Sequence, residues 1–264
     1  MKRAQTQTRS VPSSLAGVVQ ELELRQPAVV TRDLLSEIAS SAESHLDPEI
    51  LADRLVRLGW LLPLRKRDAW EFAPAARAGR YGAGDPWIEL RALLQHDPNA
   101  PVVVACESAV WELGHTSHQP TLPVLAHRRG WRPPQSLDAR TVTFDWRLDA
   151  LRVRGLPLWR EATVVVAAAH RPSAQRDWAN ADDWLPETFR ATTPDDILVE
   201  ADGRGASTLA RLGYLAEWSG REDIADQVAD VLPRRPPVSF LGPRDRRDRW
   251  SKRWRLYDAL LPIR

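Results

Sequence analysis

The stretch "HLDPEILADRLVRLGWLLPLRKRDAWEFAP", residues 45–74, decides the fold of the first part of the chain. Asp47, Pro48 and Glu49 predict a helix start, because they supply an N-cap acceptor, a proline at the first helical position and a carboxylate beside the helix dipole. The leucines that recur along one side of this helix are Leu51, Leu55 and Leu58. Gly59 marks the end of the helix, since glycine readily takes the left-handed conformation found there.

A basic hairpin follows this helix. Residues 60–64 ("WLLPL") and 70–74 ("WEFAP") are short apolar-rich segments on either side of a polar loop, which predicts two paired strands. The loop, "RKRDA", places three consecutive cations at the tip, namely Arg65, Lys66 and Arg67. A hairpin tip also carries charge for solubility alone, so a solvated turn is the alternative to a binding role.

Two further helices are predicted before residue 45. Ser14 is the expected N-cap of the first, whose apolar residues recur at i, i+3, i+4 and i+7. Thr31 is the expected N-cap of the second, which has Leu34, Leu35 and Ile38 on one face.

Three helices followed by a basic hairpin is the element order of a winged helix-turn-helix, which we predict for residues 14–80. In that arrangement the third helix enters the major groove of DNA and the hairpin reaches phosphates. The predicted DNA contacts are Arg54, Arg57, Arg65, Lys66 and Arg67, together with Lys2 and Arg3 in a flexible basic arm at residues 1–13. Arginines on a helix also commonly lie over a core, which is the alternative for Arg54 and Arg57. We expect Asp47 and Glu49 to cap the helix and not to contact bases.

The composition limits the class of protein. The 264-residue chain has a formal net charge of +2, so a nucleic-acid surface must come from local clusters of cations. Cys106 is the only cysteine, which excludes an intramolecular disulfide framework and indicates an intracellular, cytoplasmic protein. No apolar run reaches the roughly 18 residues of a membrane span, and the N-terminal stretch lacks the apolar segment of a secretory signal.

A linker is predicted at residues 76–86 ("ARAGRYGAGDP"), where Gly and Ala are concentrated, so we place a domain boundary between residues 80 and 84. Residues 84–264 are expected to form a larger mixed α+β domain, which makes the whole chain an α+β protein. Helices are predicted at residues 87–95 and 107–115. Strands are predicted at residues 101–105, 122–126, 141–146, 151–160 and 162–169.

The C-terminal part returns to helical spacing. Residues 207–220 and 221–232 predict two helices joined as an αα-hairpin by Ser219 and Gly220. Residues 244–255 then contain seven cations interleaved with tryptophans. Alternation in "RWRLYDALL", residues 253–261, favours an edge strand with its cations facing water, and stacking of bases on the aromatic side chains is the alternative.

Three segments together resemble the AbiEi-type antitoxins of type IV toxin–antitoxin systems, particularly the longer actinobacterial members; they are residues 51–74, 102–115 and 211–220. The resemblance implies an N-terminal domain that binds inverted repeats upstream of its own operon as a transcriptional repressor. It also implies a C-terminal domain that opposes a nucleotidyltransferase-like toxin, with no catalysis and no cofactor. The family wing often carries Arg-Gly before an aromatic residue, whereas this chain has Arg67, Asp68 and Ala69 before Trp70.

Two other classes of function are alternatives to an antitoxin. The first is a protein-interaction module whose N-terminal domain binds a partner and no DNA. The second is a metal nuclease, because "PDDILVEAD", residues 194–202, superficially resembles a core in which acids hold Mg²⁺ and a lysine steadies the attacking water. Asp202 stands at the lysine position, so we expect Asp195 and Asp196 to be helix-start carboxylates.

A thiol or metal site around Cys106 is a further alternative. Glu107, His115 and His118 follow closely in the sequence, but a productive Cys/His pair is set by the fold and not by proximity along the chain. We therefore favour a buried structural cysteine with ordinary surface histidines, and expect no catalytic and no metal-binding residue.

Overall fold

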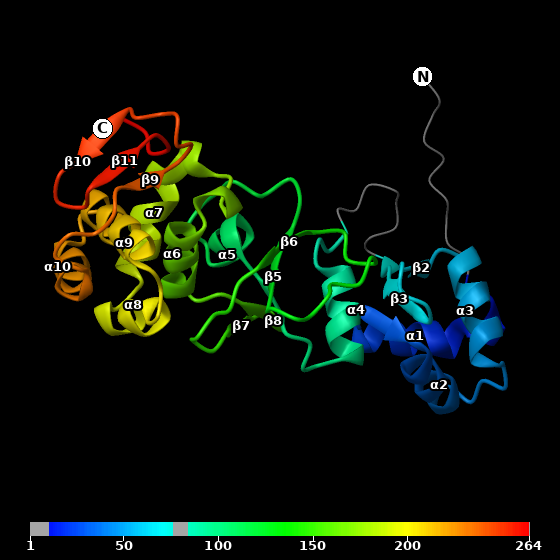
Figure 1. The fold of residues 1–264 in the computed structure, drawn as a ribbon. Helices are drawn as coiled ribbons and strands as arrows, with labels where there is room; N and C mark the ends of the chain where they lie inside the picture. Colours follow the sequence, from blue (N-terminus) through cyan, green and yellow to red (C-terminus); the bar gives the residue numbers. More distant parts are fainter. Residues whose placement is uncertain (1–10, 76–83, 264) are drawn as a thin grey trace, which may run out of the picture. The chain divides into compact units, whose positions relative to one another are not determined.

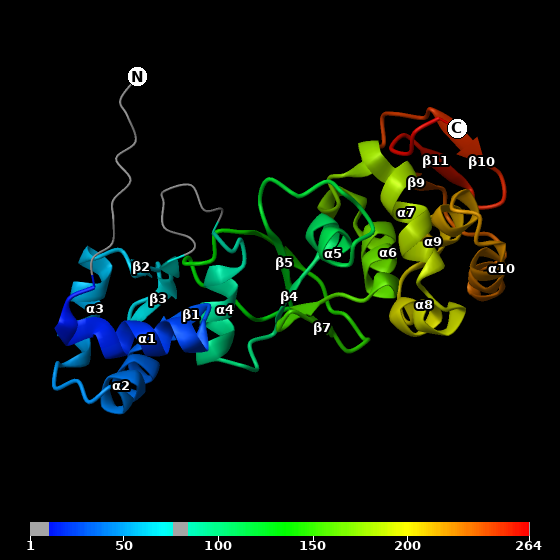
Figure 2. The ribbon, with the colours of Figure 1, turned by 180° about the vertical axis from the view of Figure 1, so that it is seen from behind.

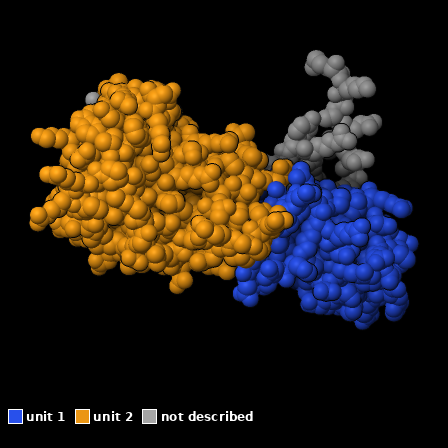
Figure 3. Space-filling view, in the orientation of Figure 1, with its two compact units in different colours: residues 1–100, 134–137 blue, residues 101–133, 138–264 orange. Residues whose placement is uncertain are grey.

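The computed structural model describes residues 11–75 and 84–263. The chain divides into two compact units, unit 1 with residues 1–100 and 134–137, and unit 2 with residues 101–133 and 138–264 (Figure 3). The predicted linker lies mostly outside the described residues, as does most of the predicted basic arm. The functional boundary between residues 80 and 84 stays a prediction.

Unit 1 combines helices with a three-stranded antiparallel sheet (Figure 1). The helices are α1 (Ala16–Arg25), α2 (Arg32–Ser41), α3 (Pro48–Arg57) and α4 (Ile88–His96), preceded by a 3₁₀ turn at Ser13–Leu15. The strands are β1 (Val29–Thr31), β2 (Leu61–Pro63) and β3 (Ala69–Phe72), in the order β1-β3-β2. The predicted order of three helices and a hairpin is therefore present, with an additional strand between the first two helices.

Two of the three predicted helix caps are confirmed. The Thr31 hydroxyl accepts a hydrogen bond from the Leu34 amide at 3.3 Å, and the Asp47 carboxylate accepts one from the Glu49 amide at 2.8 Å. The Ser14 cap is wrong, because Ser14 lies inside the 3₁₀ turn and no side chain caps α1. The 3₁₀ turn precedes α1 directly, and in it the Leu15 amide donates to the Pro12 carbonyl at 2.9 Å.

An apolar core lies between α1, α2 and α3. Its fully buried side chains include Leu22, Leu35, Ile38, Leu51 and Leu55. Complete burial of such a side chain contributes about 1.5–3 kcal/mol to folding. The leucine stripe predicted for α3 therefore points inward, and this packing determines which face of α3 meets solvent. Gly59, at φ +77°, follows the helix as predicted.

The sequence does not predict β1. Val29, Val30 and Thr31 pair with Glu71, Trp70 and Ala69 of β3. Three residues are too few to show the alternation that identifies a strand, so only the pairing with a distant segment reveals it. Strand β1 makes β3 the central strand of the sheet.

Unit 2 contains a five-stranded sheet in the order β6-β5-β4-β8-β7, together with helices. The strands are β4 (Val102–Val104), β5 (Val124–His127), β6 (Arg140–Thr143), β7 (Leu151–Val153) and β8 (Leu156–Leu158). The helices are α5 (Cys106–Glu112), α6 (Glu161–His170), α7 (Ala181–Arg190), α8 (Pro194–Ala201), α9 (Ala206–Trp218) and α10 (Glu222–Val231). With unit 1, the described residues form helices and three sheets, which confirms the mixed α+β class.

Helix α6 corrects one prediction. Residues 162–169 are predicted to form a strand, but they lie in a helix in which Ala162 to Ala169 are all buried. Helices α5, α7, α8 and α9 contact α6, so residues 162–169 have no solvent face (Figures 1 and 2). A helix buried on all sides shows no 3.6-residue period, so a short apolar run does not distinguish it from a buried strand.

A third sheet closes the chain, with β9 (Ser239–Leu241), β10 (Arg249–Ser251) and β11 (Leu256–Asp258) in the order β10-β11-β9. The predicted edge strand at residues 253–261 is wrong, since β11 has neighbours on both sides and β10 is an edge.

Trp254 precedes β11 and is fully buried on α9. A Cβ atom at Gly213 would lie 2.2 Å from the Trp254 ring, so this contact requires glycine. The αα-hairpin predicted from Ser219 and Gly220 is confirmed by α9 and α10.

Candidate functional site

The solvent face of α3 carries an ordered stripe of side chains. Ile50, Asp53, Arg54 and Arg57 follow i, i+3, i+4, i+7 spacing, and all four are exposed. Ile50 is 51% exposed, on the side of the helix away from its packed leucines. Arg54 and Arg57 form no ion pair with another described residue. The face therefore presents two unpaired guanidinium groups beside an apolar side chain.

The acids at the start of α3 have structural partners. Asp47 caps the helix through its contact with the Glu49 amide at 2.8 Å. The Glu49 carboxylate pairs with Arg32 of α2 at 2.7 Å. Asp47 therefore caps α3 as predicted, whereas the Glu49 side chain links α3 to α2.

The tip of the β2–β3 hairpin is a tight turn. The Leu64 amide donates to the Ala69 carbonyl at 3.1 Å, and Asp68 has a left-handed backbone at φ +55°. Arg65 and Arg67 are exposed, whereas Lys66 is half-buried. Arg67 is exposed and forms no ion pair with another described residue, so its guanidinium group is available to a ligand.

Two acids beyond the linker lie close to this tip, and the sequence did not indicate them. The Arg65 amide donates to Glu89 of α4 at 2.9 Å. Partial burial lowers the pKa of the Lys66 ammonium, and the nearby Asp97 carboxylate opposes that shift. The tip therefore contacts α4 and lies close to the carboxylates of Glu89 and Asp97. A contact between a hairpin and a helix that lies 24 positions further along the chain leaves no local pattern in the sequence.

The predicted DNA contacts fall into two groups. Arg54, Arg57 and the three tip cations all belong to unit 1, on α3 and on the β2–β3 turn. Lys2 and Arg3 lie outside the described residues. The structure therefore places five of the predicted contact residues in one compact unit.

The residues around Cys106 do not assemble into a thiol site. Cys106 is buried, and burial raises the pKa of its thiol to about 12. His115 contacts Glu161 at 3.3 Å and His118 lies 3.7 Å from Asp183, so the histidines have separate partners. Cys106 is a buried cysteine as predicted, although His115 is half-buried and not an ordinary surface residue.

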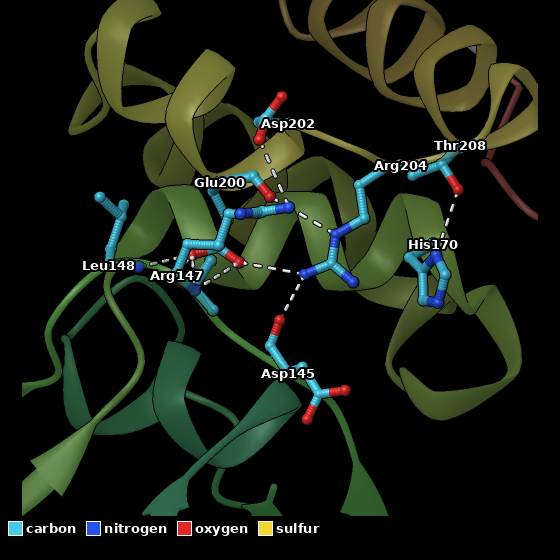
Figure 4. A network of polar contacts seen from close by, with 9 residues as sticks. Asp145, Arg147, Leu148, His170, Glu200, Asp202, Arg204 and Thr208 are labelled. Atoms are coloured by element: carbon cyan, nitrogen blue, oxygen red, sulfur yellow. Dashed lines mark hydrogen bonds and ion pairs between the residues drawn. The ribbon is translucent and has the colours of Figure 1, made fainter. Parts of the chain in front are cut away.

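A buried carboxylate organises the centre of unit 2 (Figure 4). Glu200 of α8 is fully buried and accepts hydrogen bonds from the Arg147 and Leu148 amides, each at 3.1 Å. The Thr163 hydroxyl of α6 donates to it at 3.0 Å, and the Arg204 guanidinium lies 3.4 Å away. Glu200 therefore ties together α6, α8 and the loop after β6. Its position on the buried face of α8, beside Ile197 and Ala201, is the signal that sequence reasoning missed.

Arg204 extends this network towards the surface. Its guanidinium donates to the Asp145 carbonyl at 2.6 Å and lies 4.2 Å from the centre of the Phe144 ring. His170 contacts Thr208 at 3.2 Å, and burial together with Arg204 and neighbouring arginines lowers the pKa of its imidazole. Arg204 therefore contacts both the Glu200 carboxylate and the loop after β6.

The segment that resembles a metal-nuclease core has a different role. Thr193 caps α8 by accepting from the Asp196 amide at 3.2 Å, and Asp195 and Asp196 occupy the first turn, as predicted. Asp202 lies 3.4 Å from Arg147 at the surface. Within residues 11–75 and 84–263, no group of three or more His, Cys, Asp or Glu side chains is placed to hold a metal ion.

Part of the chain matches a known protein family. Residues 102–218 match the family model of the AbiEi antitoxin C-terminal domain. The matched region runs from β4 to the end of α9 and includes the Glu200 network. This match confirms the resemblance to AbiEi-type antitoxins over residues 102–218. The AbiEi antitoxins are not an enzyme family.

A solved structure is similar over almost the whole chain. The crystal structure of the RV2827C protein from Mycobacterium tuberculosis is 26% identical, covering 96% of this chain and 94% of that chain, with a TM-score of 0.82. No curated protein sequence gave a significant match. Among the described helices, none is long and apolar enough to cross a membrane.

Proposed function

We propose that this protein is the antitoxin of a toxin–antitoxin operon that binds operator DNA through unit 1 and represses its own transcription. The AbiEi C-terminal domain supports the antitoxin role. The observation that carries the DNA-binding part is the α3 face, where Arg54 and Arg57 are exposed and unpaired within the described residues.

The arrangement of unit 1 supports a winged helix-turn-helix. Helices α2 and α3 are linked through Arg32 and Glu49, and the β2–β3 hairpin follows α3 directly. In such domains the second of the two helices lies in the major groove and the wing lies along the phosphate backbone. We assign α3 to the groove and the tip at residues 65–67 to phosphates.

The exposed side chains of α3 match the groups that contact bases in the major groove. Guanidinium groups donate to guanine, and an apolar side chain such as Ile50 fits against a thymine methyl group. Asp53 is exposed on the same face and disfavours close approach of phosphate. We therefore propose that α3 contacts base edges, and that phosphate contacts come from the tip and from Lys2 and Arg3.

We further propose that residues 84–264 oppose a nucleotidyltransferase-like toxin. This part contains the AbiEi match, within which the buried Glu200 carboxylate links α6, α8 and the loop after β6 through hydrogen bonds. Segments that are already held by such contacts lose little conformational entropy on binding, which suits direct contact with a toxin. We assign no catalytic step to the chain.

The direct test is binding to the DNA upstream of the operon in a gel-shift assay. We expect a shift with the upstream fragment that survives an excess of unrelated DNA and is lost in the Arg54→Ala, Arg57→Ala double variant. Arg190→Ala, which changes an exposed arginine of α7, is the matched control and should bind normally. If the folded protein shifts neither fragment, unit 1 is a protein-interaction module and not a DNA-binding domain.

A further inference from the structure

The outer face of the C-terminal sheet carries three aromatic side chains in one row. Trp250 of β10 is opposite Tyr257 of β11, and Tyr257 is opposite Phe240 of β9. The ring centres of Trp250 and Tyr257 are 4.6 Å apart, and those of Tyr257 and Phe240 are 5.7 Å apart. We call Trp250, Tyr257 and Phe240 the aromatic row.

The aromatic row lies on the solvent side of this sheet. Ser239, Leu241, Leu256 and Asp258 alternate with the row along the strands, and all four are buried on the side that packs against α9. Side chains at successive strand positions point to opposite faces, so the row faces away from α9. Trp250 is 47% exposed, and it stands on β10, at the edge of the sheet.

The surroundings of the aromatic row are strongly cationic. Residues 234–257 contain nine Arg or Lys residues and two carboxylates. Some of these cations have fixed roles, since Arg249 pairs with Asp258 at 2.5 Å and Arg253 with Asp226 at 2.5 Å. The exposed cations that form no ion pair with another described residue include Arg244, Arg247, Lys252 and Arg255. The Arg247 guanidinium lies 5.4 Å from the centre of the Tyr257 ring, so this charge belongs to the same surface as the row.

We propose that this surface binds a single-stranded nucleic acid, with a base stacked on Trp250 and phosphates against the unpaired cations. Aromatic faces stack on any base, and cations beside them follow the backbone, which is the combination found in proteins that bind single strands without sequence preference. Trp250 is the stacking position, because its ring terminates the row at the open edge of the sheet.

A single strand fits this surface better than a duplex or an acidic protein segment. The bases of a duplex are stacked on each other, so a flat aromatic side chain has no free base face to meet. An acidic peptide is attracted to the cations but gains nothing specific from an indole ring. Of these three ligands, only a single strand contacts the cations through its phosphates and the aromatic row through an unstacked base.

The test measures binding of the full-length protein to fluorescein-labelled oligo-U and oligo-dT by fluorescence anisotropy, with a saturating operator duplex present to occupy unit 1. Trp250→Leu keeps an apolar side chain but removes the aromatic face, and it should weaken binding about fivefold or more. Trp250→Tyr keeps a stacking ring and should bind within about threefold of the parent protein, consistent with sequence-tolerant stacking on any aromatic face. Val231→Ala, an exposed apolar position on α10, is the control. A difference between the two oligonucleotides distinguishes RNA from DNA as the natural strand.

Unchanged affinity in folded Trp250→Leu, with weaker binding in Arg247→Ala, would show a purely electrostatic surface and overturn the proposal. Equal binding of a polyglutamate peptide would overturn it in favour of an acidic protein partner. A second measurement avoids substitutions: photocrosslinking of a bromouracil oligonucleotide to the parent protein, mapped by mass spectrometry. We expect crosslinks within residues 249–257, and crosslinks confined to unit 1 would contradict the assignment.

Discussion

The arginines of α3 and those around Glu200 differ in what surrounds them. Arg54 and Arg57 extend from a helix whose other face is packed, and neither forms an ion pair with another described residue. Arg204 lies against a buried carboxylate at 3.4 Å, a backbone carbonyl at 2.6 Å and an aromatic ring. The same residue type is therefore available for a ligand in unit 1 and fixed by the fold in unit 2. The contacts that each arginine makes, and not the number of arginines, therefore distinguish a candidate binding surface from a structural network.

The largest effect is expected from removing the centre of the unit 2 network. Glu200→Ala leaves two backbone amides, the Thr163 hydroxyl and Arg204 without their buried acceptor, so we expect a loss of about 3–5 kcal/mol in the free energy of unfolding. Denaturant unfolding measures this loss. Asp202→Ala, which removes an exposed partner of Arg147, is the control and should cost less than about 0.5 kcal/mol. A loss below about 1 kcal/mol for Glu200→Ala would show that the network is not structural.

A smaller effect is expected on operator affinity from α3. Arg54→Ala or Arg57→Ala should weaken binding to operator by about 1–3 kcal/mol if the side chain contacts a base edge, with little change on unrelated DNA. Titrations on both DNAs measure the difference. The free energy of unfolding should stay within about 0.5 kcal/mol of the parent, because exposed charges contribute little to stability. Equal losses on both DNAs would place these arginines on phosphates.

The cap of α2 tests how firmly the α2–α3 pair is held. Thr31→Ala removes the acceptor for the Leu34 amide and should lower the free energy of unfolding by about 1 kcal/mol. Thr31→Ser keeps the hydroxyl and should recover most of the loss. Thermal unfolding of the two variants side by side gives the comparison, and identical melting curves would indicate that the cap contributes nothing.

The smallest change concerns Cys106. Burial raises the pKa of its thiol to about 12, so the thiol stays protonated at mildly alkaline pH and is shielded from reagents. Alkylation by iodoacetamide should therefore be slow in the native protein and fast in concentrated guanidinium chloride. Rapid alkylation of the native protein would contradict the enclosed position of this residue.

Local signals predicted unit 1 better than unit 2. The caps at Thr31 and Asp47 and the glycine at position 59 act over a few residues, so the sequence contains them in full. Helix α6 was missed because burial on every side removes the period from its sequence. Glu89 near the tip was missed because it contacts Arg65 from beyond the linker.

The candidate site shows the same limit. Exposure of Arg54 and Arg57 follows from the leucine stripe on the opposite face of α3, so the sequence predicted it. The role of Glu200 depends on amides from a loop more than fifty positions away, at Arg147 and Leu148. The aromatic row likewise appears only when β9, β10 and β11 are placed side by side.

The most direct test of the DNA-binding proposal is the salt dependence of operator affinity. Each phosphate neutralised by a cation contributes about −0.9 to the slope of log affinity against log salt concentration, so Arg65→Ala, Lys66→Ala and Arg67→Ala together should flatten the slope by about 2 to 3 units per bound protomer. Affinity should fall alike on operator and on unrelated DNA, while thermal unfolding stays close to that of the parent protein. An unchanged slope in the folded triple variant would contradict the assignment of this tip to phosphates and leave it a solvated turn.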